Sequence, residues 1–355
     1  MKIGMIGCGV ALEHHLPALR NMKDVEICWF CDPNEAQAHR AMKSWGKDSR
    51  TGGNLDDLLN SSRPDVIHIC SPPATHAELT IKALAAGCHV LLEKPMAAST
   101  VEAEQILKAR DRSGRQLCMM HNHLFDPPIV KARKLIESGL LGDLVYGEGR
   151  YFLDTPKMIE EKMDSPDHWV YSLNSGLASE YSPHTIYLLQ SFLGPASEIQ
   201  VIHENMNISP TVQPGLEAFA VQLRFQHAVG RTLMLAKMPY GHFGIDLYGT
   251  RAAVHINMMD LTYRVEMIRK GLPLVAARME STVEQGITSL IQTVANAFRI
   301  GIGSLKRRPG HRTLIKEFYR SLRSHTPVPV PGEDGLDTVR TLEMIDREIG
   351  SAIGK

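Results

Sequence analysis

A short apolar run at the start of the chain leads directly into two glycines, and this limits the local fold closely. Residues 2–6 read Lys-Ile-Gly-Met-Ile, as in a strand, and Gly7 and Gly9 follow with one residue between them. Residues 11–22 then have the character of a helix. A strand, a glycine turn and a helix N-terminus form the unit that binds a dinucleotide pyrophosphate. Gly7 would permit the turn and Gly9 would let the phosphates approach the backbone, although Leu12 replaces the third glycine of the motif.

The next strand-like run, residues 25–31, ends in an acidic residue, Asp32. A carboxylate at the end of a second strand suits hydrogen bonds to the adenosine ribose hydroxyls. Its charge would repel a 2′-phosphate, so we expect NAD rather than NADP. The alternative is that Asp32 only caps the turn before Pro33.

Three further buried strands are predicted, at residues 65–70, 89–92 and 116–120, with helices between them. Strands that alternate with helices predict a doubly wound parallel sheet. A lysine at the carboxyl end of such a strand faces the crevice where open α/β sheets bind ligands. The residues that follow these strands include Ser71, Pro72, His76, Glu93, Lys94, Pro95 and Asn122.

The second half of the chain has a different pattern. Glu180 and His184 are four residues apart, so on a helix they share one face. From residue 198 onward the sequence reads as strands, and residues 218–225 alternate strictly between apolar and polar side chains. This predicts an α+β domain with a mostly antiparallel sheet that packs one face on a helix. The other face has no obvious cover, so we expect a homodimer or homotetramer joined through it.

Together these motifs resemble the glucose–fructose oxidoreductase / inositol dehydrogenase (Gfo/Idh/MocA) family over the first third of the chain. Residues 121–127 are similar to its Asn-Arg-Arg-Phe-x-Pro segment, with His123 and Leu124 in place of the arginines. Residues 175–184 are similar to its Gly-Gly-x-x-x-Asp-x-Gly-x-His segment, with Glu180 in place of aspartate and Ser182 in place of glycine. The resemblance implies that Lys94 lies beside the nicotinamide and substrate, and that Asn122 contacts the cofactor or active site.

The expected activity is hydride transfer between NAD and a secondary hydroxyl of a sugar, cyclitol or nucleotide-linked sugar. Either Lys94 or His184 could be the base. We prefer His184, because the unperturbed pKa of histidine already lies near neutrality. The expected catalytic residues are Lys94, His184 and Glu180. The expected cofactor-binding residues are Gly7, Cys8, Gly9, Val10, Ala11, Asp32, Ser71, Pro72, His76, Glu93, Lys94, Pro95 and Asn122.

Two other functions stay open. A tightly held NAD could oxidise a sugar transiently during a lyase, glycosidase or epimerase reaction. Alternatively, a regulatory protein could bind the dinucleotide without catalysis. The presence of both Lys94 and His184 argues against the second possibility.

Length and composition set the remaining expectations. The 355 residues suggest two domains, residues 1–122 and 123–355, with C-terminal helices that could pack back on the first. Lysine plus arginine and aspartate plus glutamate number 39 each, so no nucleic-acid footprint is present. No apolar run is long enough to span a membrane, and no signal peptide precedes the first strand, which favours the cytoplasm. We expect no metal site, because Cys28 and Cys31 would face opposite sides of a strand.

Overall fold

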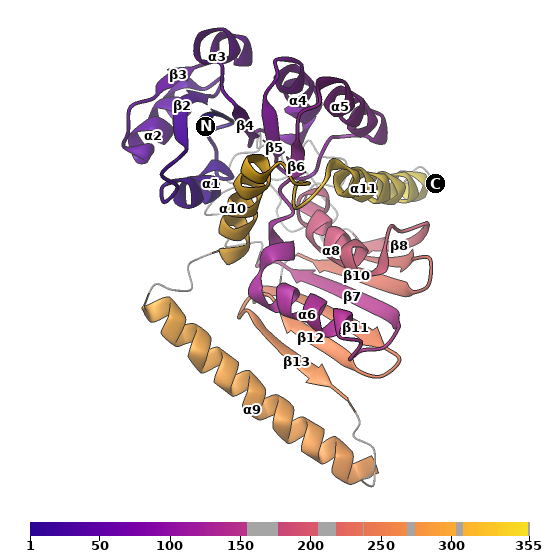
Figure 1. The fold of residues 1–355 in the computed structure, drawn as a ribbon. Coiled ribbons are helices and arrows are strands. Elements are labelled where there is room, and N and C mark those ends of the chain that lie inside the picture. The colour runs from indigo at the N-terminus through magenta and orange to yellow at the C-terminus, as the bar shows by residue number, and fades with distance from the viewer. Residues whose placement is uncertain (155–176, 205–217, 237, 268–273, 303–307, 354–355) are drawn as a thin grey trace. The chain divides into compact units, whose positions relative to one another are not determined.

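The computed structural model describes residues 1–154, 177–204, 218–236, 238–267, 274–302 and 308–353. The chain divides into two compact units (Figure 1). Residues 1–122 and 310–340 form the first, and residues 123–309 and 341–355 form the second. The division falls within the last helix, α11 (Gly332–Ile353).

The first unit contains a six-stranded sheet in which every described pairing is parallel. The strand order is β3-β2-β1-β4-β5-β6. This is the order of the dinucleotide-binding α/β fold, which reverses direction between β1 and β4. The predicted doubly wound parallel sheet is therefore confirmed. The strands are β1 (Lys2–Ile6), β2 (Glu26–Cys31), β3 (Arg50–Gly52), β4 (Val66–Ile69), β5 (His89–Leu92) and β6 (Leu117–Met119).

The central strands of this sheet are buried on both faces. In β5, Val90, Leu91 and Leu92 have no exposed surface, as expected when helices cover both sides of a parallel sheet. Local signals set the helix ends: Asn34 and Ser99 accept hydrogen bonds from first-turn amides of α2 and α5. The helices of this unit are α1 (Leu12–Leu19), α2 (Glu35–Trp45), α3 (Leu55–Ser62), α4 (His76–Ala85), α5 (Thr100–Ser113) and α10 (Pro309–Ser324). Short 3₁₀ turns lie at η1 (Pro73–Thr75) and η2 (Asn122–Phe125).

The second unit contains a seven-stranded sheet with the order β13-β12-β11-β7-β10-β9-β8. All pairings are antiparallel except that of β7 with β10, so the predicted mostly antiparallel sheet is confirmed. Helices α6 (Pro127–Glu137) and α8 (Leu177–Leu193) contact it. The strands are β7 (Leu144–Phe152), β8 (Glu198–Glu204), β9 (Ala218–Arg224), β10 (Val229–Leu235), β11 (His242–Gly249), β12 (Ala253–Asn257) and β13 (Thr262–Glu266).

The two faces of this sheet differ in chemistry. Along β9, Phe219 and Val221 are buried in the apolar core with residues of α8, whereas Gln222 and Arg224 are exposed. The face opposite the core carries ion pairs between neighbouring strands. His255 Nδ1 of β12 lies 3.0 Å from Asp246 Oδ1 of β11, and the other oxygen of this carboxylate pairs with Arg150 of β7. Arg231 of β10 lies 3.0 Å from Glu148 of β7.

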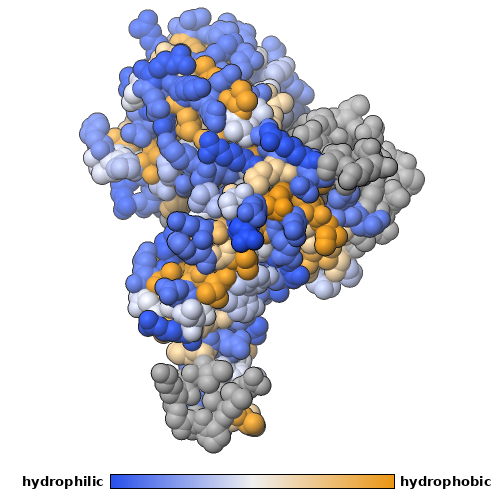
Figure 2. Space-filling view, turned by 90° about the vertical axis from the view of Figure 1, so that its right-hand side faces the viewer, coloured by the Kyte–Doolittle hydropathy of each residue, from blue (hydrophilic) through white to orange (hydrophobic). Residues whose placement is uncertain are grey.

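Among the described residues, no helix combines the length and the hydropathy needed to cross a bilayer. On the face shown in Figure 2, hydrophobic atoms form separate patches between hydrophilic ones.

Candidate functional site

Gly7 lies where the ends of β1 and β4 approach each other. Its φ is +80°, a left-handed conformation that favours glycine. A Cβ there would lie 2.5 Å from the amide nitrogen of Ser71 and 2.7 Å from the carbonyl oxygen of Cys70. Any side chain would therefore push β1 and β4 apart at the point where the strand order reverses, which is where this fold binds its ligand.

The segment between β1 and α1 fits an anionic group. A Cβ at Gly9 would meet nothing within 4 Å, and the Val10 side chain is 54% exposed. Ala11, which precedes α1, makes no side-chain cap. In the first turn of α1, the amides of Glu13 and His14 donate to the carbonyl oxygens of Val10 and Ala11. The helix N-terminus still carries partial positive charge, which favours phosphate oxygens beside the glycine turn.

Asp32 is held by two backbone amides. Its Oδ2 accepts a hydrogen bond from the amide of Cys8 at 2.8 Å, and its Oδ1 accepts one from the amide of Asn34 at 2.8 Å. Asp32 therefore caps the turn after β2 and is also fixed against the glycine turn. Each carboxylate oxygen has capacity for a second hydrogen bond, so this position also fits the expected contact with ribose hydroxyls.

Two cysteine thiols lie beside this carboxylate. Burial, together with the negative charge of Asp32, raises the pKa of Cys8 and of Cys31 to about 12. Both thiols therefore stay protonated near neutral pH and add no charge at the glycine turn.

His76 joins the segments that follow β4 and β5. Its Nε2 lies 2.8 Å from the carbonyl oxygen of Ser71, and its Nδ1 lies 2.8 Å from that of Pro95. Burial lowers the pKa of His76 although both carbonyls favour the protonated ring. Pro72 lies exposed in the loop that this contact fixes.

The Glu-Lys-Pro motif is anchored by a buried chain of hydrogen bonds. Glu93 Oε1 lies 2.9 Å from His15 Nε2, and His15 Nδ1 lies 2.8 Å from His68 Nδ1. His68 Nε2 in turn lies 2.8 Å from the hydroxyl of Tyr319. One arrangement of hydrogens satisfies all three contacts with neutral rings: Tyr319 donates to His68, His68 donates to His15, and His15 donates to the Glu93 carboxylate.

The protonation states along this hydrogen-bond chain follow from its burial. Burial alone would raise the pKa of Glu93, but the hydrogen bond from His15 and the electrostatic interaction with its ring, with a contribution from Lys94, outweigh it and lower that pKa. Burial lowers the pKa of His68 well below its ordinary value, and His15 adds to this effect. Glu93 is thus a buried carboxylate directly before Lys94. Sequence reasoning missed His15, His68 and Tyr319, although two histidines in apolar segments were a visible signal.

In the second unit, His184 lies on α8 among aromatic rings. Its Nδ1 lies 3.0 Å from the hydroxyl oxygen of Tyr187, which also accepts a hydrogen bond from the amide of His123 at 3.3 Å. The rings of His123 and Tyr151 lie with their centroids 4.8 and 6.1 Å from that of His184. Tyr187 was also missed, although its spacing from His184 places it on the same helix face.

Glu180 lies one turn before His184 on α8 and interacts electrostatically with Tyr151, whose ring lies near that of His184. Burial raises the pKa of Tyr151 to about 12, with an opposing effect from Arg308 and a further increase from the negative charge of Glu180. Tyr151 therefore stays protonated near neutral pH and can donate a hydrogen bond.

The structure places the predicted residues in two groups. The first unit holds the expected cofactor residues, which follow the carboxyl ends of β1, β2, β4, β5 and β6; the last of them, Asn122, is buried. Glu180 and His184 belong to the second unit.

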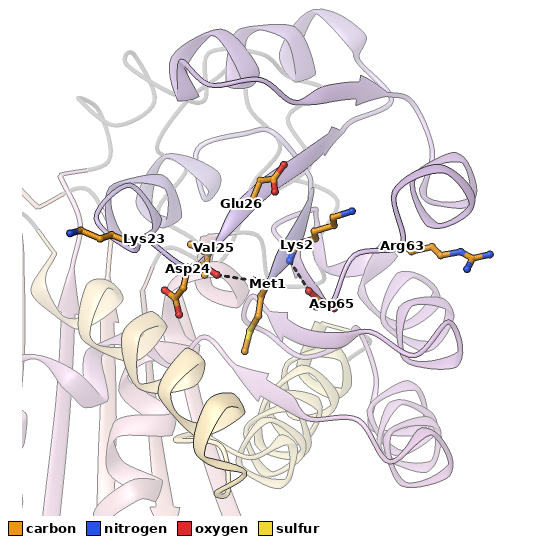
Figure 3. A pocket seen from close by; sticks show the side chains of 8 residues that line it. All are labelled: Met1, Lys2, Lys23, Asp24, Val25, Glu26, Arg63 and Asp65. Carbon is orange, nitrogen blue, oxygen red and sulfur yellow. Dashed lines mark hydrogen bonds between the residues drawn. The ribbon is translucent and has the colours of Figure 1, made fainter.

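An open depression of about 520 Å³ lies at the opposite edge of the first sheet (Figure 3). Its lining comes from the amino ends of β1 and β2 and from Asp65 before β4, with charges of both signs. Because the dinucleotide motifs follow the carboxyl ends, this depression is not the candidate site.

We predict that His15→Phe lowers the free energy of unfolding by about 3–5 kcal/mol at neutral pH, because it leaves Glu93 buried without its main partner. The pKa of Glu93 is lowered in the fold, so its contribution is present above the ordinary glutamate pKa of about 4.3 and is lost as the pH falls below it. The difference in free energy of unfolding between His15→Phe and the unaltered protein should therefore become smaller at acidic pH. Urea unfolding across pH measures it, with exposed His39→Phe as the control. An equally large loss at every pH would contradict the assignment.

Comparison with known proteins places the chain in a family. A model described as an oxidoreductase family with an NAD-binding Rossmann fold matches residues 1–121, and the Gfo/Idh/MocA C-terminal domain model matches residues 129–255. The chain is similar to inositol 2-dehydrogenase of Salmonella paratyphi B, at 23% identity over 220 residues, which cover 59% of this chain and 66% of that protein. It is also similar to D-glucoside 3-dehydrogenase of Escherichia coli, at 30% identity over 145 residues and 41% of each chain.

The match thus spans just under two thirds of the first relative and well under half of the second. Among solved structures, the WlbA dehydrogenase from Bordetella pertussis in complex with NADH and UDP-GlcNAcA has the same fold, with a TM-score of 0.81, 19% identity, and coverage of 99% of this chain and 96% of that one. Since the two family models together match well over half of its residues, the chain belongs to the Gfo/Idh/MocA family of oxidoreductases.

Proposed function

We propose that this protein is an NAD-dependent oxidoreductase that transfers a hydride between nicotinamide and a secondary hydroxyl of a sugar, cyclitol or nucleotide-linked sugar. The observation that carries the proposal is Glu93-Lys94-Pro95 at the carboxyl end of β5, held by a buried hydrogen-bond chain. Family membership and the two similar dehydrogenases support the same reaction class.

The first unit would hold the cofactor through residues with separate tasks. The glycine turn, from Gly7 to Ala11, would bind the pyrophosphate at the start of α1. Asp32 would accept hydrogen bonds from the adenosine ribose, and its charge would disfavour the 2′-phosphate of NADP. When bound, the cofactor supplies a hydride acceptor or donor.

The chain's own residues would then move the hydroxyl proton. Lys94, kept charged, would stabilise the developing alkoxide, and His184 would take the proton at Nε2. For this, Nδ1 must carry the other hydrogen, and the oxygen of Tyr187 is placed to accept it. Tyr187 would thus set the tautomer of His184, while Glu180 positions the substrate.

The rival in which a recycled NAD serves a lyase, glycosidase or epimerase differs in one measurable respect. It forms product without net NADH, whereas a dehydrogenase forms both together. A regulatory protein that only binds the dinucleotide would form neither.

We also propose a homodimer or homotetramer joined through the face of the second sheet that carries Arg231 and Glu148. Both side chains are only partly buried, and the core lies on the other face. A cytoplasmic location stays a prediction.

For the cofactor, we predict tighter binding of NAD than of NADP. Asp32→Ala should weaken NAD binding by about ten-fold, equivalent to about 1.4 kcal/mol. It should also reduce the difference in affinity between NAD and NADP. Asp32→Asn keeps one acceptor and removes the charge, so it isolates the effect on NADP. Calorimetry measures both, with exposed Asp56→Ala as the control. Equal or tighter binding of NADP by the unaltered protein would refute the preference.

For catalysis, Lys94→Ala and His184→Ala should each lower kcat by about 10²–10⁴-fold while NAD affinity stays nearly unchanged. If both groups act on one hydroxyl, the double variant should lose less than the product of the single losses. Glu180→Gln should raise KM more than it lowers kcat, and Tyr187→Phe should lower kcat less than His184→Ala. Steady-state kinetics test this, with exposed Lys108→Ala as the control. Near-normal kcat in His184→Ala would mean that the proton leaves by another route.

For the assembly, light scattering at micromolar concentration should give twice or four times the mass of one chain. Arg231→Glu would place like charges on the proposed face and should lower that mass. A monomeric mass for the unaltered protein would be inconsistent with this proposal.

A further inference from the structure

Helix α9 (Leu274–Gly301) turns a polar side toward the sheet. The side-chain amide of Gln292 donates to the carbonyl oxygen of Tyr263 and accepts from its amide, both at 2.8 Å. Asn296 donates to the carbonyl oxygens of Asp260 and Leu261, both at 3.0 Å. The groups of Tyr263 belong to β13, the edge strand of the sheet, and would otherwise be open to another chain. Asp260 and Leu261 lie directly before this strand.

The apolar side of α9 consequently faces away from the sheet. A surface helix normally does the reverse, with its apolar stripe on the core. Ten of the twenty exposed large hydrophobic residues in the described part of the chain lie on α9 or directly after it. Eight of them form two rows at four-residue spacing, each side chain 55–71% exposed. The rows are Val275, Met279, Val283 and Ile287, then Leu290, Val294, Phe298 and Ile302.

The size of this surface, the apolar rows of α9, matches a protein interface. Eight such side chains expose roughly 900 Å², comparable to the ~800 Å² per partner of a standard interface. It exceeds the 300–600 Å² or so of the largest apolar patch on a typical monomer.

The spacing of the apolar rows points to the partner. Along the chain the steps are four, four, four, three, four, four and four residues, which read the same in both directions. In an antiparallel pair, Met279 of one copy would therefore face Phe298 of the other, and Val283 would face Val294. Self-complementarity of this kind is what a two-fold interface between identical chains requires.

Gly286 lies beside these rows, one turn before Leu290. A Cβ there would meet nothing within 4 Å in this chain, yet glycine inside a helix costs about 1 kcal/mol relative to alanine. In the antiparallel pair, Gly286 would face Ile291 of the second copy and leave room for that side chain.

The charges of α9 argue against a lipid surface as the partner. Residues 274–302 contain two arginines, Arg278 and Arg299, and two glutamates, Glu280 and Glu284. A helix that lies on an anionic membrane is instead rich in lysine and arginine on its polar side. In α9 that polar side is occupied by the bonds to β13 and to the residues directly before it.

We propose that the apolar rows of α9 dock antiparallel on the same rows of a second copy of this chain. This contact is separate from the proposed sheet-face contact. Two different two-fold contacts would close a tetramer, whereas α9 pairing alone would give a dimer.

Light scattering on the full chain tests the contact. Leu290→Glu should halve the mass, from tetramer to dimer or, if the sheet face does not associate, from dimer to monomer. Val101→Glu, at an exposed apolar position on α5, should leave the mass unchanged. Circular dichroism checks that both variants remain helical.

Cross-linking tests the orientation even if Leu290→Glu folds poorly. Differently tagged Met279→Cys and Phe298→Cys chains, mixed and mildly oxidised, should form a mixed disulfide dimer. Met279→Cys alone should not form one above the background of the unaltered protein. Equal mass in Leu290→Glu together with no mixed disulfide would overturn the proposal. So would a monomer that co-sediments with phosphatidylcholine–phosphatidylglycerol vesicles.

Discussion

The hydrogen bond between the buried carboxylate of Glu93 and the ring of His15 is the contact on which the candidate site depends. A buried charge is tolerated only when it is paired and hydrogen-bonded. Here the pair links the end of β5 to α1, and His68 and Tyr319 extend the link to β4 and α10. The segment that carries Lys94 is therefore fixed by elements from both ends of the chain. Substitution of His15, His68 or Tyr319 should therefore alter the position of Lys94.

The same edge of the sheet shows why the dinucleotide motifs have their form. At Gly7 two strand ends approach so closely that no side chain fits, and at Gly9 the backbone is open. Asp32 ties these features together, because one of its oxygens holds the glycine turn and the other holds its own turn. Its two possible roles, as a turn cap and as a ribose acceptor, are thus compatible in one geometry.

Sequence periodicity predicted most of this fold, because buried strands, glycine turns and strict alternation are local signals. It did not predict β3 or β13, which are only three and five residues long. Periodicity also could not predict the hydrogen-bond chain from Glu93 to Tyr319. The residues joined by its successive hydrogen bonds are 78, 53 and 251 positions apart in the sequence. The apolar row of α9 was visible in the sequence. The contact of its polar side with β13 and the residues directly before it could not be predicted. It is made by the side-chain amides of only two residues, Gln292 and Asn296, and two residues leave no periodic signal in the sequence.

We propose that residues after the carboxyl ends of the first sheet serve hydride transfer to or from a carbohydrate-type hydroxyl. The most direct measurement is nicotinamide absorbance during incubation of the unaltered protein and NAD with a panel of sugars, cyclitols and nucleotide-linked sugars. For at least one member of the panel, NADH should form in an amount equal to that of the oxidised product. Product without net NADH, or no reaction in either direction across the panel, would contradict it.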